Sequence, residues 1–167
     1  MGDYELATSP KSQFVEMFGD EPVENGKWKV ERLGDCLSSI ENGKSFFCSD
    51  SKRLGKYPAI LKLSAVTYGE YNQYENKALL DESMFVKNVE VKQGDLLFTR
   101  KNTPELVGMA AYVFNTERYL MMPDLIFRLN VKEGLNKLYL WKLINHPIFR
   151  ERIQNLANGS AKSMSNI

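Results

Sequence analysis

The stretch Gly94-Asp95-Leu96-Leu97-Phe98-Thr99-Arg100-Lys101-Asn102-Thr103-Pro104-Glu105-Leu106-Val107-Gly108 joins two apolar runs through a polar turn. The apolar run at 96–98 predicts a buried strand, and Pro104 and Gly108 restrict the loop that follows it. We expect the turn to be exposed and to offer side chains that can contact phosphates and base edges. These side chains belong to Arg100, Lys101, Asn102 and Thr103.

Short apolar runs alternate with turns on both sides of this stretch. They predict strands at 57–63, 88–91, 96–99, 109–114, 119–122 and 125–131, and short helices at 33–40 and 81–85. Leu138, Trp141 and Ile144 share a helical face, and Pro147 begins a second helix. Because closely spaced strands favour hairpins over βαβ units, the sequence predicts an α+β fold. We expect a curved, largely antiparallel β-sheet with short helices at both ends.

The chain divides into three expected segments. Residues 1–27 predict a short amphipathic helix, with Phe14, Met17 and Phe18 at helical spacing, followed by a linker. Residues 28–160 predict one globular domain, in agreement with 43% hydrophobic and 26% charged residues. Residues 161–167 predict a frayed tail.

The charges are unevenly placed along the chain. The net charge is +1, but residues 1–27 carry six acids against two lysines, so the remainder carries +5. This mild bias is compatible with DNA contact through local clusters. The sequence lacks an apolar run of the roughly eighteen residues that a membrane span needs, and its N-terminus lacks the pattern of a signal peptide. We therefore expect a cytoplasmic protein with no membrane partner.

Catalytic and metal-binding patterns are weak. Two cysteines, Cys36 and Cys48, and the single histidine, His146, are too few soft ligands for a zinc site. His146 precedes Pro147 at a helix junction and is expected to cap a helix. We therefore expect neither a metal site nor a catalytic residue.

One alternative involves Asp81, Glu90 and Lys92, which imitate the D…ExK constellation of magnesium-dependent nucleases. In such sites two carboxylates hold the ion and the lysine assists the attacking water. We expect these residues to be solvated instead, alternating with buried Val89 and Val91. A small magnesium-dependent DNA endonuclease remains the alternative function.

Further candidate recognition residues surround the strand expected at 57–63. Lys62 and Ser64 project to the same side of its extension, and residues 67–74 form a polar loop with three tyrosines. Asn and Gln can pair with adenine, Arg and Lys with guanine, and Tyr can contact phosphate or stack on a base. The candidate DNA-binding residues are Lys44, Lys62, Ser64, Tyr68, Tyr71, Asn72, Gln73, Arg100, Lys101, Asn102 and Thr103.

Several motifs, in order, resemble those of the target recognition domain of type I restriction-modification specificity subunits. The stretch GDLLFTR with the later LVG, at 94–108, resembles the family's strand and turn. The same resemblance holds for WKVERLGD at 28–35, IENGKS at 40–45 and YPAILKLSAV at 57–66, and Gly159-Ser160 stands where such domains leave their final helix. FVEMFGD at 14–20 resembles the end of the conserved spacer helix that precedes such a domain.

This resemblance implies a recognition subunit, or a fragment of one, that is not itself an enzyme. It would read one half of a bipartite double-stranded DNA target and direct methyltransferase (modification) and restriction subunits to it. S-adenosylmethionine, ATP and magnesium would belong to those partner subunits, so this chain would hold no cofactor. A second recognition domain or a copy of itself would read the other half.

Overall fold

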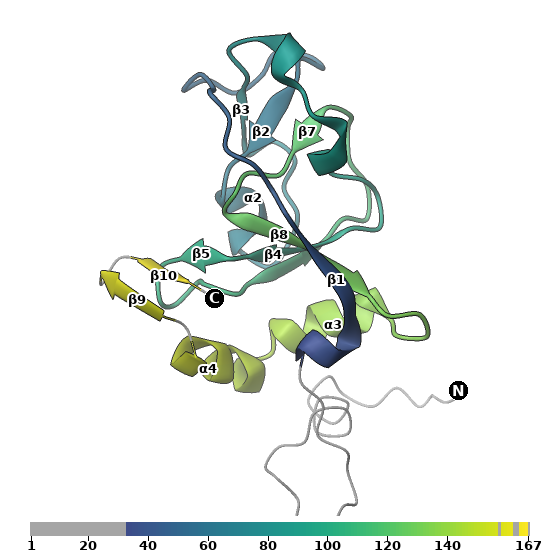
Figure 1. The fold of residues 1–167 in the computed structure, drawn as a ribbon, viewed down its shortest axis with the longest axis vertical. Coiled ribbons are helices and arrows are strands. Elements are labelled where there is room, and N and C mark those ends of the chain that lie inside the picture. Colours follow the sequence, from purple (N-terminus) through teal and green to yellow (C-terminus); the bar gives the residue numbers. More distant parts are fainter. Residues whose placement is uncertain (1–32, 157, 162–163, 167) are drawn as a thin grey trace, which may run out of the picture.

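The computed structural model describes residues 33–156, 158–161 and 164–166 (Figure 1). The helix and linker expected at 1–27 lie outside the described residues, and the domain limits of 28 and 160 stay a prediction. A four-stranded sheet lies at the centre, with helix α3 (Lys137–Ile144) along one side and a smaller, three-stranded sheet at the opposite end (Figure 1). The expected α+β fold with mostly antiparallel strands is confirmed.

The central sheet has the order β1-β8-β4-β6, and each neighbouring pair is antiparallel. Leu96 and Phe98 of β4 pack into one apolar cluster and Leu97 into a second one. The strand is therefore buried on both faces, which explains an apolar run without polar alternation. The strands of this sheet are β1 (Leu37–Asn42), β8 (Ile126–Val131), β4 (Leu96–Thr99) and β6 (Ala110–Tyr112).

The helix expected at 33–40 is only partly present. A 3-10 helix, η1 (Leu33–Cys36), occupies its first half, and strand β1 begins directly after it. Ile40 lies opposite Leu129 of β8, and Glu41 lies opposite Arg128. Pairing with a strand distant in sequence therefore overrides the local helical preference of this segment.

The smaller sheet contains β3 (Asn76–Ala78), β2 (Ala59–Leu61) and β7 (Leu120–Met121). Strands β2 and β3 are antiparallel, whereas β2 and β7 are parallel. The strand expected at 88–91 is not formed: its first half lies in a 3-10 helix, η3 (Lys87–Val89), and Glu90 makes one bridge with Met121. Helix α2 (Ser64–Thr67) follows β2, and the 3-10 helix η2 (Glu82–Met84) falls within the helix expected at 81–85.

The two C-terminal helices are confirmed as α3 (Lys137–Ile144) and α4 (Pro147–Leu156). Asn136 caps α3, because its side-chain oxygen accepts the Leu138 amide at 2.8 Å. His146 caps α4 as expected, since its Nδ1 accepts the Ile148 amide at 3.2 Å.

A third sheet forms where the sequence predicts a frayed tail at 161–167. Strand β10 (Met164–Asn166) pairs with β5 (Lys101–Asn102) on one side and with β9 (Asn158–Ala161) on the other. Where the sequence predicts a frayed tail, residues 164–166 instead form a paired strand. A short strand such as β5 carries free backbone donors and acceptors along its edge, and pairing with β10 satisfies them.

Candidate nucleic-acid interface

The turn that follows β4 is held against the body of the domain. Asn102 is only 6% exposed; its Nδ2 donates to Thr67 Oγ1 at 3.0 Å and its Oδ1 accepts the Thr103 amide at 2.8 Å. Arg150 of α4 donates to the Val107 carbonyl at 2.6 Å, and burial lowers the pKa of its guanidinium. The expected exposure of Asn102 is therefore wrong, because its amide ties the turn to α2.

Arg100 also follows β4, but it contacts another part of the chain, the turn that precedes β8. Its Nη1 donates to the Asp124 carbonyl at 3.1 Å, and its backbone amide donates to the Leu125 carbonyl at 2.9 Å. The guanidinium carbon lies 5.8 Å from the centre of the Phe127 ring. Arg100 is half-exposed in this position, so its charge is available at the surface next to residues 123–125.

A groove of about 450 Å³ opens between the smaller sheet and this turn. Lys62 and Ser64 both line it. Glu75 lies between them, accepting from Ser64 Oγ at 2.8 Å and standing 4.0 Å from Lys62 Nζ. The full lining is Cys48, Ile60, Leu61, Lys62, Leu63, Ser64, Lys77, Pro123 and Leu125.

Lys77 joins this site through the register of the smaller sheet. It lies on β3 directly opposite Ile60 of β2, and two residues in register on antiparallel strands present side chains to the same face. In sequence, Lys77 stands in a polar segment with no distinguishing pattern around it. Only the pairing of β2 with β3 brings it beside Lys62.

Lys44 reaches the same region through the loop after β1. Its amide donates to the Met122 carbonyl at 3.1 Å, and Ser45 Oγ donates to Asp124 Oδ2 at 2.9 Å. Gly43 makes this approach possible, because a Cβ there would lie 1.9 Å from the Pro123 carbonyl oxygen. Residues from separate parts of the chain thus meet at the turn at 122–125.

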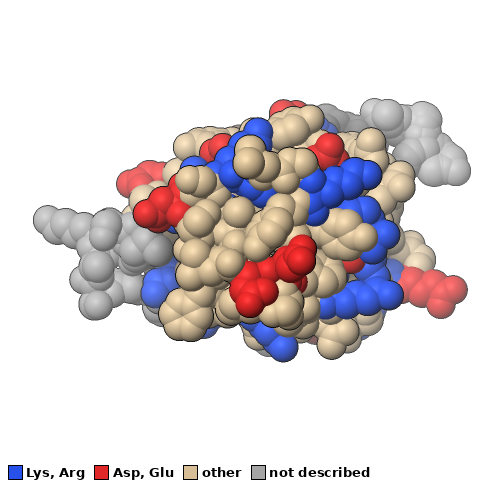
Figure 2. Space-filling view, turned by 90° about the horizontal axis from the view of Figure 1, so that it is seen from above, with Lys and Arg blue, Asp and Glu red and all other residues tan. Residues whose placement is uncertain are grey.

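We name this region the cationic groove and define it by Lys44, Lys62, Lys77 and Arg100 around the turn at 122–125. Figure 2 views the molecule from the end that carries the smaller sheet. Lys and Arg side chains form an arc along one side of that face, whereas Asp and Glu gather in smaller groups. On this face the basic side chains are therefore gathered toward one side.

Tyr71 and Gln73 are anchored away from the groove. The Tyr71 hydroxyl lies 2.7 Å from Thr116 Oγ1, and burial raises the pKa of this hydroxyl to about 12. The side-chain oxygen of Gln73 accepts the Glu117 amide at 2.7 Å. These two residues hold the loop at 68–75 against the loop at 115–119, so their polar groups already have partners.

The remaining candidates are dispersed. Tyr68 is 74% exposed at the end of α2, and Asn72 is exposed with its Oδ1 accepting the Tyr74 amide. Lys101 lies on β5 and Thr103 directly follows it, and both are half-buried. Of the eleven candidates, Lys62 and Ser64 line the groove, and Lys44 and Arg100 contact the turn at 122–125 beside it.

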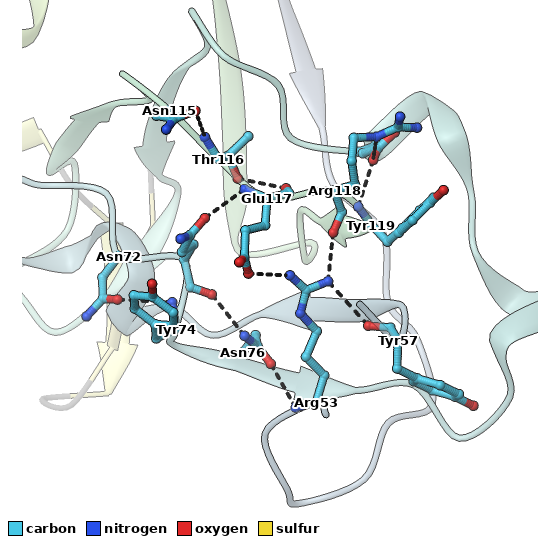
Figure 3. Close-up of polar contacts among 12 residues, drawn as sticks. Arg53, Tyr57, Asn72, Tyr74, Asn76, Asn115, Thr116, Glu117, Arg118 and Tyr119 are labelled. Carbon is cyan, nitrogen blue, oxygen red and sulfur yellow. Dashed lines mark hydrogen bonds and ion pairs between the residues drawn. The ribbon is translucent and has the colours of Figure 1, made fainter. Parts of the chain in front are cut away.

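Sequence reasoning missed Arg53, which joins three loops (Figure 3). Its side chain is 3% exposed, and its guanidinium donates to the carbonyls of Tyr57 at 3.3 Å and Arg118 at 2.7 Å. The same group forms an ion pair of 3.0 Å with Glu117, and the Arg53 amide donates to Asn76 Oδ1. An arginine in a charged loop gives no sequence signal of such burial.

Both carboxylates of the D…ExK alternative are engaged in other contacts. Glu90 is 2% exposed, and its Oε2 accepts from Arg118 Nε at 3.1 Å and from the Tyr119 amide at 2.8 Å. The expectation of a solvated Glu90 is therefore wrong. Asp81 instead caps η2, where the Ser83 amide lowers its pKa. Throughout the described part of the chain, we find no group of three His, Cys, Asp or Glu side chains placed to hold a metal ion.

Comparison with known proteins identifies a similar protein. Over 142 residues the chain is 28% identical to the specificity subunit of the type I restriction enzyme EcoEI from Escherichia coli. The chain is related to a type I specificity subunit. This confirms the resemblance seen in the sequence motifs. The match covers 84% of this chain and 24% of the EcoEI subunit, so the chain spans about a quarter of the length of that relative.

No family model matches the chain. Among the described residues, no helix is both long enough and apolar enough to cross a membrane.

Proposed function

We propose that this chain is a DNA target recognition domain of a type I restriction-modification specificity subunit. It reads one half of a bipartite target and directs the methyltransferase and restriction subunits to that site. The similarity to the EcoEI specificity subunit is the observation that carries this proposal. The cationic groove supports it, because protein–DNA interfaces combine a basic surface with polar groups that reach phosphates and base edges.

In this proposal the groove residues divide into two roles. Lys44, Lys62 and Lys77 contact phosphates, which fixes the position of the domain on the duplex. Arg100 provides the donors that reach base edges, and the Ser64 hydroxyl, which donates its proton to Glu75, offers its oxygen as an acceptor. The half-exposed guanidinium of Arg100 is held by the Asp124 carbonyl through one nitrogen, so its other donors remain available for a guanine.

The chain supplies no reaction of its own in this account. S-adenosylmethionine, ATP and magnesium act in the partner subunits, and the assembly works in the cytoplasm. The other half of the target is read by a second recognition domain or by a copy of this chain. The proposal gains support from Glu90, whose carboxylate is engaged by Arg118 and the Tyr119 amide and so is not placed for a nuclease reaction.

The isolated chain is expected to bind duplex DNA weakly and with a strong dependence on salt. Binding is weak because the isolated domain contacts only one half of the target and lacks the contacts of the second recognition domain and the partner subunits. Titrations of a mixed-sequence duplex between about 50 and 200 mM salt measure the slope of log affinity against log salt. Lys62→Ala and Lys77→Ala should each reduce that slope by about one unit.

Lys87 provides the matched control for these variants. It is an exposed lysine on η3, outside the cationic groove, so Lys87→Ala should leave the slope unchanged. Absence of DNA binding at low salt would contradict the proposed function. If Lys62→Ala, Lys77→Ala and Lys87→Ala all keep the wild-type slope of log affinity against log salt, the groove is not the DNA-binding surface.

A further inference from the structure

Apolar side chains form a partly exposed patch where helix α3 packs against β6, the edge strand of the central sheet. Phe114 is 57% exposed, and its ring meets the Trp141 ring edge-on, with 5.5 Å between the ring centres. Leu138, one helical turn before Trp141, is 39% exposed. Lys142 is exposed, and its Nζ lies 4.2 Å from the centre of the Trp141 ring. We name Phe114, Leu138, Trp141 and Lys142 the aromatic patch.

The aromatic patch rests on a fixed base. Trp141 Nε1 donates to the Gly69 carbonyl at 2.7 Å, which sets the orientation of the indole ring. The Tyr112 ring meets the Phe114 ring edge-on as well, with 4.7 Å between the ring centres. Because these rings are already held in place, a segment that docks on them costs little further loss of side-chain freedom.

The N-terminal segment carries apolar and charged groups that complement this patch. The amphipathic helix expected there places Phe14, Met17 and Phe18 on one face. A helix this short is marginal in water until its apolar face is buried. Acidic residues stand within and directly after this apolar run, at Glu16, Asp20 and Glu21. The segment at 1–27 has six acids against two lysines, whereas Lys142 places a positive charge on the patch.

The connection to the described fold favours this segment over a separate partner. The first described element, η1, begins at Leu33, which packs against the same apolar cluster that contains Trp141. Leu33 follows Phe18 by 15 residues. Such a length of chain reaches up to about 50 Å, more than the roughly 15 Å between the outer strands of a four-stranded sheet. A tether of this length keeps the segment at an effective concentration on the order of millimolar.

We propose that residues 14–18 dock on the aromatic patch of the same chain. Phe14, Met17 and Phe18 cover Phe114 and Leu138, and the neighbouring acids face Lys142. Docking fixes the position at which the N-terminal segment meets the recognition domain. This inference goes beyond the proposed function and does not depend on DNA binding.

Trypsin cleavage at Lys11, three residues before Phe14, measures docking in the full chain. The protease needs the segment to open, so the cleavage rate follows the population of the undocked state. Phe114→Ser and Leu138→Ser should each speed this cleavage on the order of tenfold, because each removes apolar area from the contact. Phe18→Ser should act alike, and adding it to Phe114→Ser should change the rate little further, since the two side chains share one contact.

The charge contribution is tested separately. Lys142→Glu should speed cleavage at Lys11 at low salt and have a smaller effect at high salt, because salt screens the attraction to the acids.

Leu54→Ser is the matched control for the apolar variants. Leu54 is 88% exposed and lines a separate groove with Glu82 and Tyr119, so its replacement should leave the cleavage rate at Lys11 unchanged. Amide hydrogen exchange in the buried strand β4 should be the same in Phe114→Ser and the wild type, which checks that the variant keeps its fold.

Three results would overturn the inference. The first is cleavage at Lys11 in the wild-type chain as fast as in a free peptide of residues 1–27. The second is a protected Lys11 site that neither Phe114→Ser nor Leu138→Ser opens, because the segment then docks elsewhere. The third is loss of association with the methyltransferase subunit in both variants while cleavage stays at the wild-type rate, because the patch then binds a protein partner.

Discussion

Replacing Arg128 by leucine is expected to lower the free energy of unfolding by about 3–5 kcal/mol, because it leaves buried acceptors without their donor. The Arg128 side chain is 11% exposed and that of Asp95 is 13% exposed. Arg128 Nε donates to Asp95 Oδ2 at 3.0 Å, and its Nη1 lies 3.2 Å from Glu41 Oε1. Its guanidinium also donates to the carbonyls of Asn88 and Glu90.

These contacts connect parts of the chain that are distant in sequence. Arg128 lies on β8, Glu41 on the neighbouring β1, and Asp95 in the turn that leads into β4. The Asp95 carboxylate also accepts the Lys92 amide at 2.9 Å, so one carboxylate fixes both the turn and the arginine. Loss of Arg128 should therefore loosen the turn before β4 as well as reduce stability.

Urea unfolding of the wild type and Arg128→Leu measures this effect as a shift of the midpoint. Lys132→Leu is the matched control, because Lys132 follows β8 directly and its side chain is exposed. It should change stability by less than about 0.5 kcal/mol. A loss below about 1 kcal/mol for Arg128→Leu would show that the buried network contributes little.

Replacing Arg53 by methionine is expected to cost about 2–4 kcal/mol of unfolding free energy. Methionine keeps much of the side-chain length but leaves the carbonyls of Tyr57 and Arg118 without their donor. Glu117 is 48% exposed, so water can replace Arg53 at its carboxylate, and the cost falls mainly on the two carbonyls.

The loops that Arg53 joins should also exchange amide hydrogens faster in this variant. The Glu117 amide, which donates to Gln73 Oε1, reports on two of these loops at once. Lys52→Met is the matched control: Lys52 is exposed and contacts the Tyr74 ring from 4.6 Å. Equal stability and equal exchange for both variants would show that Arg53 does not hold the loops together.

Periodicity and turn chemistry were sufficient to predict the parts of the fold that are locally determined. The run at 96–98 is a strand because three consecutive apolar residues can be buried only when both faces of the sheet are covered. Helix α4 begins at Pro147, as expected for a proline in the first turn. Strand β1 was missed, since its conformation depends on pairing with β8 across the length of the chain.

The candidate site was predictable only in part, because residue type does not reveal which polar groups find partners. Asn102 has the side chain of an adenine reader, yet its amide binds Thr67 in the interior. Glu90 occupies an alternating pattern that suggests exposure, yet it is buried against Arg118. Lys77 became a candidate only when strand register placed it beside Lys62.

If this chain is a target recognition domain, it determines which DNA sequence the assembled enzyme methylates. The direct measurement replaces the matched stretch of the EcoEI specificity subunit by this chain, adds the partner methyltransferase subunits, and maps the methylated adenines in genomic DNA. We predict that one half of the methylated bipartite sequence changes while the other half and the activity are retained. An assembled complex that methylates the original sequence in both halves would contradict the account.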